Sequence, residues 1–476
     1  MKFGRVAWAV AVRLVCALTA ATLYVPDEHW QSREVAHHMV FGEGYLTWEW
    51  HRGLRSVAFP LIYAIPFYVL KQLHLDSAYT LDLAVRGVGV CFAVILDWST
   101  AKLATRLFDK RVGQYTFLLS LSSMFNWFSS TRSIANAVEA SLCAAAVSVW
   151  PWNDTRRGKE TAWLLSLILA ALTCMIRPTN AVIWLVLVGL TLVSHPGHGV
   201  RLIKRVCVVG AGALGVLLGM DRLYYGHWQL TPLHFVQFNL VQGLSSFYGE
   251  HPWHWYITQG VPVMFGTQLV LLLPGVYYGA HHSPATRHTL LVALTYIAVF
   301  SMLGHKEFRF LYPVLPLLLP FAGFGVDWCR HRLSPGWRRG LTWMLLWTQL
   351  LPGVYLNSVH QRGVVDVMQW LSTASDVTRV VFLMPCHSTP FRAAVHRPVH
   401  MQFLTCEPPL HSTRTNHVDQ ADQFYTDPLP FLDMLPWPSH VILFEALLTQ
   451  HPQVSTRLTA LQYTEVSHVY YSADSA

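Results

Sequence analysis

Two adjacent carboxylates stand near the start of the chain, within the segment 25–50. Asp27 and Glu28 follow an apolar run directly and precede a stretch whose hydrophobic residues fall on one side of a helix. A carboxylate in this position can accept a proton from a hydroxyl group, so the pair is a candidate for acid–base chemistry. The same residues also suit a structural role, with Asp27 as a helix N-cap, Glu28 complementing the helix dipole and Trp30 anchoring the helix in the membrane interface. The two roles are compatible, and both stay open.

A second polar group, GHKEFRF at 304–310, is enclosed between two apolar runs. Lys306 and Arg309 stand three residues apart, so they share one face if the segment is helical, and such a pair would bind a phosphate group. Cations at a helix end can instead extend toward the aqueous interface. With His305 and Glu307 beside the two cations, the density of ionisable residues exceeds what a helix end requires, and it favours a functional site.

The segment 221–256 is crowded with aromatic and histidine side chains, which suit either a platform for sugar rings or a belt at the level of the lipid headgroups. From this segment His251, Trp253 and His254 are candidates for acceptor or sugar binding, as is Trp30 of the first loop. His251 and His254 have the spacing of metal ligands, but no Cys or carboxylate accompanies them at ligand spacing, so we predict no metal site.

Other ionisable residues lie in or beside apolar runs. Glu139 falls within the run 133–150, and it is a candidate functional residue because a carboxylate is costly to place in a membrane. Arg132 and Arg177 are predicted at the ends of apolar runs, where a single arginine is more often structural.

The elements that must position these residues are membrane helices. Of the 476 residues, 53% are hydrophobic and 13% are charged, and the mean hydropathy is +0.33, whereas a soluble domain has about 25% charged residues. This composition excludes a soluble enzyme. The net charge of +8 is spread over short basic segments between apolar runs. We therefore interpret it as a topology signal rather than a nucleic-acid-binding surface.

Apolar runs occur throughout the first three quarters of the chain, at 6–24, 56–70, 81–98, 113–130, 133–150, 162–177, 181–194, 206–220, 259–280, 288–304, 310–327 and 341–357. The run 56–70 is short and contains two prolines, so we expect it to be re-entrant or interfacial and the other eleven to span. With a cytosolic N-terminus, this topology places the basic loops in the cytosol, as the positive-inside rule requires. The sequon at Asn153 is then cytosolic, and its glycosylation would contradict eleven spans.

This topology predicts an all-α polytopic membrane bundle at 1–357, with a lumenal first loop at 25–80, and a lumenal C-terminal domain at 358–476. In the tail, the hydrophobic segments 379–384 and 440–444 are typical of short strands, so the C-terminal domain should be small and mixed α/β. Cys386 and Cys406 lie in this tail. Whether they form a disulfide stays open, because the sequence does not give their separation.

Five stretches combine into a recognisable set: PDEHWQSREVAHHMVFGEGYLTWEW in the first loop, TRSIANAVE at 131–139, FYGEHPWHWY at 247–256, HKEFRF at 305–310 and FLMPCHSTPF at 382–391. Together they resemble glycosyltransferase family 22, the α-mannosyltransferases of GT-C fold that use dolichyl-phosphate mannose. The first-loop motif and HKEFRF are general to that family. The stretches HPWHWY and MPCHSTP are more particular to its branch that acts on glycosylphosphatidylinositol (GPI) precursors.

The resemblance implies transfer of the third mannose, α-1,2-linked, from dolichyl-phosphate mannose to the second mannose of the GPI precursor, by a multi-pass protein of the endoplasmic reticulum membrane whose active site is lumenal. An inverting displacement needs one base, for which Asp27 is the first candidate and Glu28 the second or an orienting partner. His305, Lys306 and Arg309 would meet the charge of the leaving phosphate. No cofactor is implied. The partners are the two lipid-linked substrates, and the sequence indicates no protein partner.

Three alternatives remain. A sister enzyme acting on the fourth GPI mannose or on dolichol-linked oligosaccharide would differ only in its acceptor. A secondary transporter should show repeat symmetry and broken helices near the midplane, whereas the polar motifs here lie in lumenal loops. A non-catalytic lipid-binding or assembly subunit would have no use for Asp27.

Overall fold

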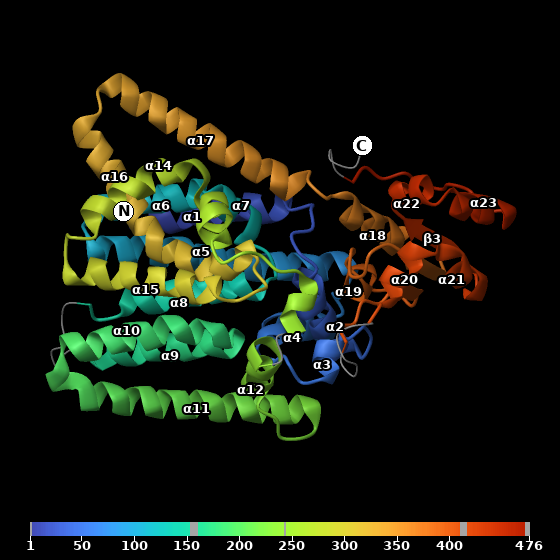
Figure 1. Ribbon diagram of the computed structural model, residues 1–476, viewed down its shortest axis with the longest axis horizontal. Helices are drawn as coiled ribbons and strands as arrows, with labels where there is room; N and C mark the ends of the chain where they lie inside the picture. The colour runs from blue at the N-terminus through green and yellow to red at the C-terminus, as the bar shows by residue number, and fades with distance from the viewer. Residues whose placement is uncertain (1, 153–159, 242–243, 410–416, 472–476) are drawn as a thin grey trace. The chain divides into compact units, whose positions relative to one another are not determined.

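The structure of the protein is a computed structural model that describes residues 2–152, 160–241, 244–409 and 417–471 (Figure 1). Asn153, whose glycosylation tests the topology, lies outside these residues. The chain forms two compact units. The first, called here the helical unit, comprises Met1–Ala20, Gly53–Tyr63 and Ala84–Asn357. The second, called here the tail unit, comprises Ala21–Arg52, Ala64–Leu83 and Ser358–Ala476.

The α-helices are α1 (Lys2–Thr19), α2 (Glu34–Phe41), α3 (Trp48–His51), α4 (Ala58–Gln72), α5 (Ala78–Leu107), α6 (Lys110–Ser122), α7 (Met124–Ser129), α8 (Ala135–Val149), α9 (Glu160–Ile176), α10 (Ala181–Ser194), α11 (Gly199–Tyr225), α12 (Thr231–Val236), α13 (Val261–Phe265), α14 (Leu269–Gly279), α15 (Pro284–Ser301), α16 (Leu315–Arg332), α17 (Pro335–Ser358), α18 (Gly363–Thr373), α19 (Arg392–Val395), α20 (Gln420–Thr426), α21 (Pro428–Met434), α22 (Glu445–Gln450) and α23 (Pro452–Ala460). The strands are β1 (Arg379–Leu383), β2 (His400–Phe403) and β3 (His440–Leu443). Four irregular helical turns near the motifs are the π-helical turns η1 (His29–Arg33) and η7 (Tyr256–Gly260) and the 3₁₀ turns η3 (Pro178–Asn180) and η9 (Phe308–Val314).

The helical unit is a bundle of apolar helices. Four helical segments of the described chain are long and apolar enough to cross a membrane, namely Ala78–Leu107, Gly199–Tyr225, Tyr256–Gly279 and Phe308–Arg332. Three shorter apolar helices are Ala135–Val149, Glu160–Ile176 and Pro178–Ser194. A mostly helical membrane bundle is thus confirmed, whereas the number of eleven spans stays a prediction.

Close helix packing in this unit depends on small residues. Helix α16 packs against α14 and α6, α8 packs against α9, and α9 packs against α11. Figure 1 shows α9 and α11 side by side. A Cβ atom added to Gly275 of α14 would overlap the carbonyl group of Phe321, and one added to Gly325 of α16 would overlap that of Leu271. Glycine therefore lets the two backbones touch, as in many membrane helix pairs.

Two predicted runs have a different internal structure from a single straight span. The run 113–130 is divided between α6 and α7, because Ser123 leaves the helical conformation (φ −57°, ψ 123°) and caps α7 through its hydroxyl. The run 56–70 forms α4, with Pro60 in the first turn, where proline is tolerated, and Pro66 inside the helix. Its non-spanning placement stays a prediction.

A charge inside the first apolar run is paired. Arg13 is fully buried, and its guanidinium donates two hydrogen bonds of 2.8 Å to the carboxylate of Asp97. Asp97 also accepts a 2.6 Å hydrogen bond from Ser120. A buried arginine is tolerated where a carboxylate satisfies it in this way, so Arg13 is compatible with a membrane helix.

The tail unit contains a three-stranded parallel sheet in the order β2-β1-β3. Strands β1 and β3 lie where the sequence predicted them, and β2 was not predicted because its sequence, HMQF, has a weak hydrophobic pattern. Central strand β1 is buried on both faces: Val380 and Phe382 belong to one hydrophobic cluster, and Val381 and Leu383 to another. This alternation follows from the two-residue period of a strand.

The first of these clusters also contains residues of the first loop. Leu23 and Trp30 pack with Met368 and Leu371 of α18 and with Phe382 of β1. The amphipathic stretch after Asp27 therefore lies in the core of the tail unit rather than only on a membrane surface. The predicted boundary between 357 and 358 coincides with a boundary of the tail unit, which in addition takes in two segments of the first loop.

Candidate active site

The two first-loop carboxylates begin the helical segment that leads into η1. Glu28 is only 2% exposed. One of its carboxylate oxygens accepts a 3.3 Å hydrogen bond from the Tyr24 amide, and the other lies 3.9 Å from the Arg33 guanidinium. Asp27 is half-buried. A base must reach its substrate, and Asp27 is the more accessible of the two carboxylates; which of them is the base stays a prediction. The widened π-helical turn that follows is a feature often found beside functional sites.

Trp30 joins this segment to the motif MPCHSTP. Its indole is 3% exposed, and its nitrogen donates a 3.0 Å hydrogen bond to the carbonyl oxygen of Thr389. The ring stacks on Phe391 at 5.1 Å and contacts His387 at 4.4 Å and Phe403 at 4.9 Å between ring centroids. The structure thus gives Trp30 a packing role that holds Asp27 against the tail, and the predicted contact with a sugar stays a prediction.

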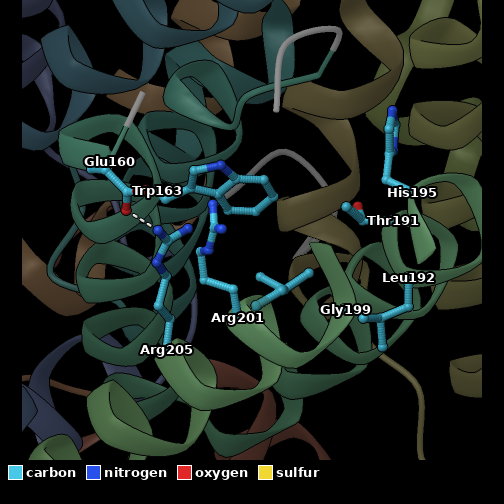
Figure 2. Close-up of a pocket in the computed structure, with 9 residues that line it drawn as sticks. Glu160, Trp163, Thr191, Leu192, His195, Gly199, Arg201 and Arg205 are labelled. Carbon is cyan, nitrogen blue, oxygen red and sulfur yellow. Dashed lines mark ion pairs between the residues drawn. The ribbon is translucent and has the colours of Figure 1, made fainter. Parts of the chain in front are cut away.

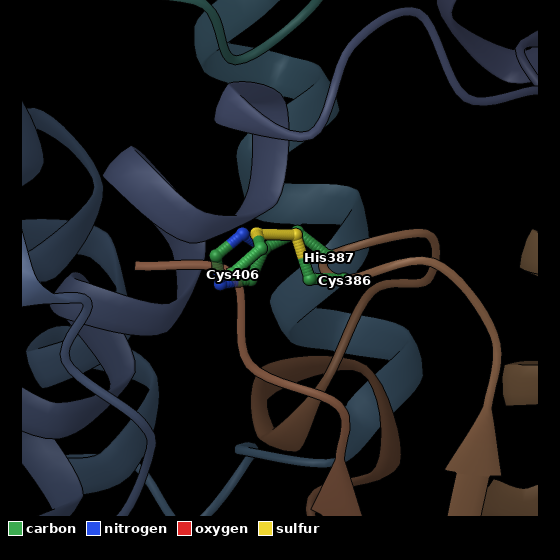
Figure 3. A group of neighbouring side chains, drawn as sticks. All are labelled: Cys386, His387 and Cys406. Atoms are coloured by element: carbon green, nitrogen blue, oxygen red, sulfur yellow. A yellow bond between two sulfur atoms is a disulfide. The ribbon is translucent and has the colours of Figure 1, made fainter. Parts of the chain in front are cut away.

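Cys386 and Cys406 form a disulfide, with their Cα atoms 5.9 Å apart (Figure 3). His387 lies beside the disulfide, and the three side chains are close enough to resemble a metal site. However, the two sulfur atoms are bonded to each other, so neither is a thiolate ligand. His387 has a left-handed backbone conformation (φ 59°), which for a residue other than glycine is typical of a constrained and often functional position.

The imidazole of His387 is an electrostatic neighbour of Asp27. Burial lowers the pKa of His387 to about 4, although the carboxylate of Asp27 acts in the opposite direction. At neutral pH the imidazole is therefore uncharged, and it places a polar ring near the candidate base without adding a competing positive charge.

The motif HKEFRF is organised around Glu307. Arg309 donates two hydrogen bonds to its carboxylate, of 2.7 and 2.6 Å, and the His305 ring lies 3.3 Å from the same group. Burial alone would raise the pKa of Glu307, but Arg309 and His305 together hold it below its usual value. For His305 burial lowers the pKa, while the hydrogen bonds to Glu307 and to the Gly249 carbonyl outweigh burial and raise it.

The condition for Lys306 and Arg309 to share one helical face, a helix that includes both residues, is not met. The 3₁₀ turn η9 begins only at Phe308, and Lys306 precedes it in non-helical backbone. Lys306 is 3% exposed, and its ammonium donates to the carbonyl oxygens of His251, Leu303 and Gly304. Because these acceptors take up its three N–H donors, Lys306 stabilises the loop and contributes charge rather than a direct hydrogen bond in this arrangement.

The loop 249–256 lies directly against this motif. The His251 amide donates a 3.0 Å hydrogen bond to the Gly304 carbonyl, and the Tyr256 hydroxyl lies 3.3 Å from both the amide nitrogen and the carbonyl oxygen of Glu307. The His251 ring stacks on Trp255 with centroids 4.6 Å apart. Trp253 is 65% exposed, and His254 is exposed too. These side chains are accessible, and both a sugar platform and a headgroup belt remain consistent with them.

The motif TRSIANAVE meets HKEFRF through an arginine to which the sequence gave no specific role. The Glu139 carboxylate lies 3.1 Å from Nε of Arg177 and accepts a 2.9 Å hydrogen bond from Asn180 of η3. The Arg177 guanidinium in turn lies 5.4 Å from the centroid of the Phe310 ring, and Arg309 lies 5.5 Å from the same centroid. Three segments far apart in sequence thereby form one polar network. The one local feature of the sequence that could have marked Arg177 is its position directly before a proline at which a helical turn begins.

A pocket in the helical unit is lined by residues of α9, α10 and α11 (Figure 2). Glu160 pairs with Arg205 there, and Trp163, His195 and Arg201 also line it. Its lining includes none of the predicted site residues, and its basic residues belong to a loop that is predicted to be cytosolic.

The described residues combine a bundle of apolar helices, a small parallel sheet and a set of carboxylate and cationic motifs. The fold agrees with solved structures of ArnT from Cupriavidus metallidurans, in the apo state (TM-score 0.60, 15% identity, 99% of this chain and 96% of that chain) and bound to undecaprenyl phosphate (TM-score 0.58, 13% identity, the same coverage).

The chain belongs to the Alg9-like mannosyltransferase family, whose sequence pattern matches residues 6–396. It is 36% identical to GPI alpha-1,2-mannosyltransferase 3 of Mus musculus over 98% of this chain and 85% of that protein. It is 39% identical to GPI mannosyltransferase 3 of Yarrowia lipolytica over 95% of this chain and 90% of that protein. The protein is therefore a glycosyltransferase, as the sequence motifs predicted.

Proposed function

We propose that the protein transfers an α-1,2-linked mannose from dolichyl-phosphate mannose to the second mannose of the GPI precursor, at the lumenal face of the endoplasmic reticulum membrane. The observation that carries the proposal is the extent of the similarity to the named GPI mannosyltransferases, which covers 98% and 95% of the chain. The match includes the tail, where MPCHSTP packs on the Asp27 segment through Trp30.

In this reaction Asp27 accepts the proton of the attacking 2-hydroxyl group. The hydroxyl oxygen forms a new bond to the anomeric carbon of mannose, and the bond from that carbon to the phosphate oxygen breaks. Dolichyl phosphate leaves with the bonding electrons, so the anomeric configuration inverts. Phosphate is a good leaving group, so a single base suffices and a general acid is not required.

Glu28 and His387 would support the base rather than act on substrate. The buried Glu28 carboxylate is held by Tyr24 and Arg33, so it fixes the turn that carries Asp27. The imidazole of His387 is uncharged at neutral pH, so it adds no positive charge of its own beside Asp27.

The negative charge that develops on the departing phosphate requires fixed positive charge in a poorly hydrated environment. The cationic motif HKEFRF supplies it in the helical unit, with Arg309 and His305 oriented by Glu307. The binding of undecaprenyl phosphate by ArnT, which shares the fold, supports a polyprenyl phosphate as one substrate.

The test is transfer of labelled mannose in microsomes that contain the wild-type chain, the Asp27→Asn variant or the Glu28→Gln variant. Each receives dolichyl-phosphate mannose and, in parallel, a two-mannose GPI lipid or a dolichol-linked oligosaccharide. We expect a three-mannose GPI product that α-1,2-mannosidase digests, and a loss of about 10²- to 10⁴-fold in rate for Asp27→Asn. Glu28→Gln should retain part of the activity.

Label on the oligosaccharide alone would assign the protein to a sister activity. Full activity of Asp27→Asn would remove Asp27 as the base.

We also infer eleven spans with the first loop and the tail in the lumen. Glycosylation reporters introduced at Arg332 and at Ser358 should be unmodified and modified, respectively.

A further inference from the structure

The pocket between α9 and α11 in Figure 2 has an excess of positive charge in its lining. The carboxylate and guanidinium groups of the lining are those of Glu160 on α9 and of Arg201 and Arg205 on α11. Arg201 and Arg205 stand four residues apart, so their side chains share one face of the helix. Figure 2 shows both side chains extending toward Glu160 and Trp163. Two guanidinium groups and one carboxylate leave one positive charge unbalanced.

The single carboxylate is engaged by only one of the two arginines. Glu160 forms an ion pair with Arg205, so the charge of Arg205 is balanced within the pocket. The exposed side chain of Arg201 makes neither a hydrogen bond nor an ion pair with any residue in 2–152, 160–241, 244–409 or 417–471. Arg201 therefore has guanidinium N–H donors available for an anion from outside the chain.

The position of Arg201 in its helix also favours an anion. It is the third residue of α11, and the first turn of this helix contains no acidic residue. The N-terminus of a helix carries a partial positive charge, so a cation in the first turn is unfavourable there and a bound anion is favourable. Helix α9 shows the usual arrangement, since it begins with Glu160. The helix end and the arginine thus attract the same kind of ligand.

The remainder of the pocket and its surroundings are apolar. Trp163 and Leu202 are buried lining residues, and the Trp163 ring packs on Trp150 with centroids 4.7 Å apart. On either side of Arg201, α11 exposes Val200 (86%) and Ile203 (50%). A ligand at this site therefore has a charged contact and apolar contacts within a few residues of each other, as an amphiphile requires.

The pocket lies at the end of a membrane helix. The segment Gly199–Tyr225 is long and apolar enough to cross a membrane, and little of it is buried inside the protein. In the predicted topology its first residues are on the cytosolic side. The cytosolic leaflet carries anionic lipids, and basic pockets between membrane helices on this side are typical binding sites for their headgroups. A lipid is thus favoured over a soluble anion.

We propose that this pocket binds the headgroup phosphate of an anionic phospholipid, with Arg201 as the direct donor. Arg205, paired with Glu160, adds a balanced charge that fixes the wall of the pocket. The bound lipid would join the start of α11 to α9, against which α11 packs. This site goes beyond the proposed function, because its ligand is neither of the two substrates and its occupation requires no transfer of mannose.

The primary test is lipid binding by the purified full-length protein in a neutral detergent, measured by native mass spectrometry. The probe is dioctanoyl phosphatidylglycerol, which carries one negative charge and is not part of either substrate. The comparison lipid is dioctanoyl phosphatidylcholine, which has the same chains and no net charge. We expect one phosphatidylglycerol to bind the wild type about 10-fold more tightly than phosphatidylcholine, since only the former balances the charge of the pocket.

Arg201→Gln should weaken the binding of phosphatidylglycerol about 10-fold and leave that of phosphatidylcholine within about twofold, as for loss of hydrogen bonds to a charged group. Arg201→Lys should recover part of the affinity, because it restores the charge without the paired donors. Arg339→Gln removes an exposed arginine from another link that is predicted to be cytosolic, and it is the matched control. Each variant should keep the melting temperature of the wild type when no lipid is added.

Glu160→Gln provides a test with the opposite sign. It removes the carboxylate that balances Arg205, and the Glu160 side chain is 53% exposed, so the substitution is tolerated by the fold. If an anion is bound by the charge of this pocket, affinity for phosphatidylglycerol should rise about threefold or more, because a second guanidinium becomes available. A merely structural ion pair would give no gain in lipid affinity.

The other outcomes overturn the inference. Wild-type affinity of Arg201→Gln for phosphatidylglycerol, or weaker binding by Glu160→Gln, would mean that the charge of the pocket does not hold the lipid. Equal binding of the two lipids would leave only their chains as the cause. Displacement of phosphatidylglycerol by inorganic phosphate at a similar concentration would assign the pocket to a soluble anion. A failure to mannosylate a GPI lipid would contradict the proposed function and leave these binding results unaffected.

Discussion

Replacing Glu34 by glutamine should stabilise the tail unit at neutral pH. Glu34 lies on α2, seven residues after Asp27, and it is fully buried. One carboxylate oxygen accepts a 2.8 Å hydrogen bond from the amide of Ala393 at the short helix α19. Gly44, with φ 135°, packs beside Glu34: a Cβ atom there would lie 3.2 Å from the Glu34 backbone carbonyl and in ordinary contact, at 3.5 Å, with the other carboxylate oxygen. The site has therefore little room for water around the carboxylate.

The magnitude follows from the pKa of Glu34. Burial raises it from 4.5 to about 8, although the backbone amides of 391–393 and the charge of Arg392 act in the opposite direction. Because the pKa is higher in the folded state, folding favours the protonated form. The stabilisation is complete below pH 4.5, falls as pH rises, and is lost above pH 8. At 1.36 kcal/mol per pH unit, the loss at pH 7 relative to pH 4.5 is about 3 kcal/mol.

Glutamine preserves the shape of the side chain and its acceptor for Ala393, but it does not ionise. The Glu34→Gln variant should therefore match the wild type near pH 5 and exceed it by about 3 kcal/mol at pH 7, equivalent to several degrees in melting temperature. The assay is the apparent melting temperature of the detergent-solubilised full-length protein, followed by tryptophan fluorescence between pH 5 and pH 8. Glu43→Gln, an exposed residue that pairs with Arg392, is the control and should change stability by less than about 1 kcal/mol.

An equal loss of melting temperature at pH 5 and pH 7 would refute this reasoning, since it would mean that Glu34 is charged in the folded protein and stabilises through its charge. If the melting temperature of Glu34→Gln depends on pH as strongly as that of the wild type, another group causes the pH dependence. His37 and His396 are histidine candidates, because a nitrogen of one ring lies 2.8 Å from a nitrogen of the other and burial lowers the pKa of each.

Three further variants test the site. Cys386→Ser opens a bridge across a sequence separation of 20 residues, and it should cost about 3 kcal/mol and increase proteolysis of the tail. Glu307→Gln weakens the bidentate contact with Arg309, and it should lower the transfer rate about tenfold or more without a comparable change in melting temperature. His387→Phe preserves ring packing but removes the polar ring near Asp27, so transfer should slow while the melting temperature stays within about 2 °C.

Exposed residues of the same types provide the controls, namely Cys207→Ser, Glu465→Gln and His468→Phe. Each should leave transfer and melting temperature unchanged. If Cys386→Ser melts like the wild type with and without reductant, the bridge does not stabilise the tail. Wild-type rates for Glu307→Gln or His387→Phe would remove these residues from the positioning roles described above.

Composition and local patterns were sufficient for the class of protein and for the location of its polar motifs. The low charge and long apolar runs require helices in a membrane, because each helix satisfies its own backbone hydrogen bonds. The alternating segments at β1 and β3 predicted two of the three strands, since a strand repeats every two residues. The family motifs pointed to the mannosyltransferase activity. Each of these signals lies within a short stretch of chain.

The partners of these motifs were set by contacts between distant segments, and spacing along the chain carries no information about them. Trp30 was expected at a surface, yet it packs against residues almost 360 positions later. Lys306 has the charge of a phosphate ligand, but the fold brings three carbonyl groups to its three donors, and hydrogen bonding there replaces the hydration of the ammonium. Arg177 has little local signal in the sequence, and only tertiary packing brings its guanidinium over the Phe310 ring and its Nε atom to Glu139. Sequence thus determined which charges the protein contains, whereas tertiary packing decided which of them are paired inside the protein, because their partners come from distant segments of the chain.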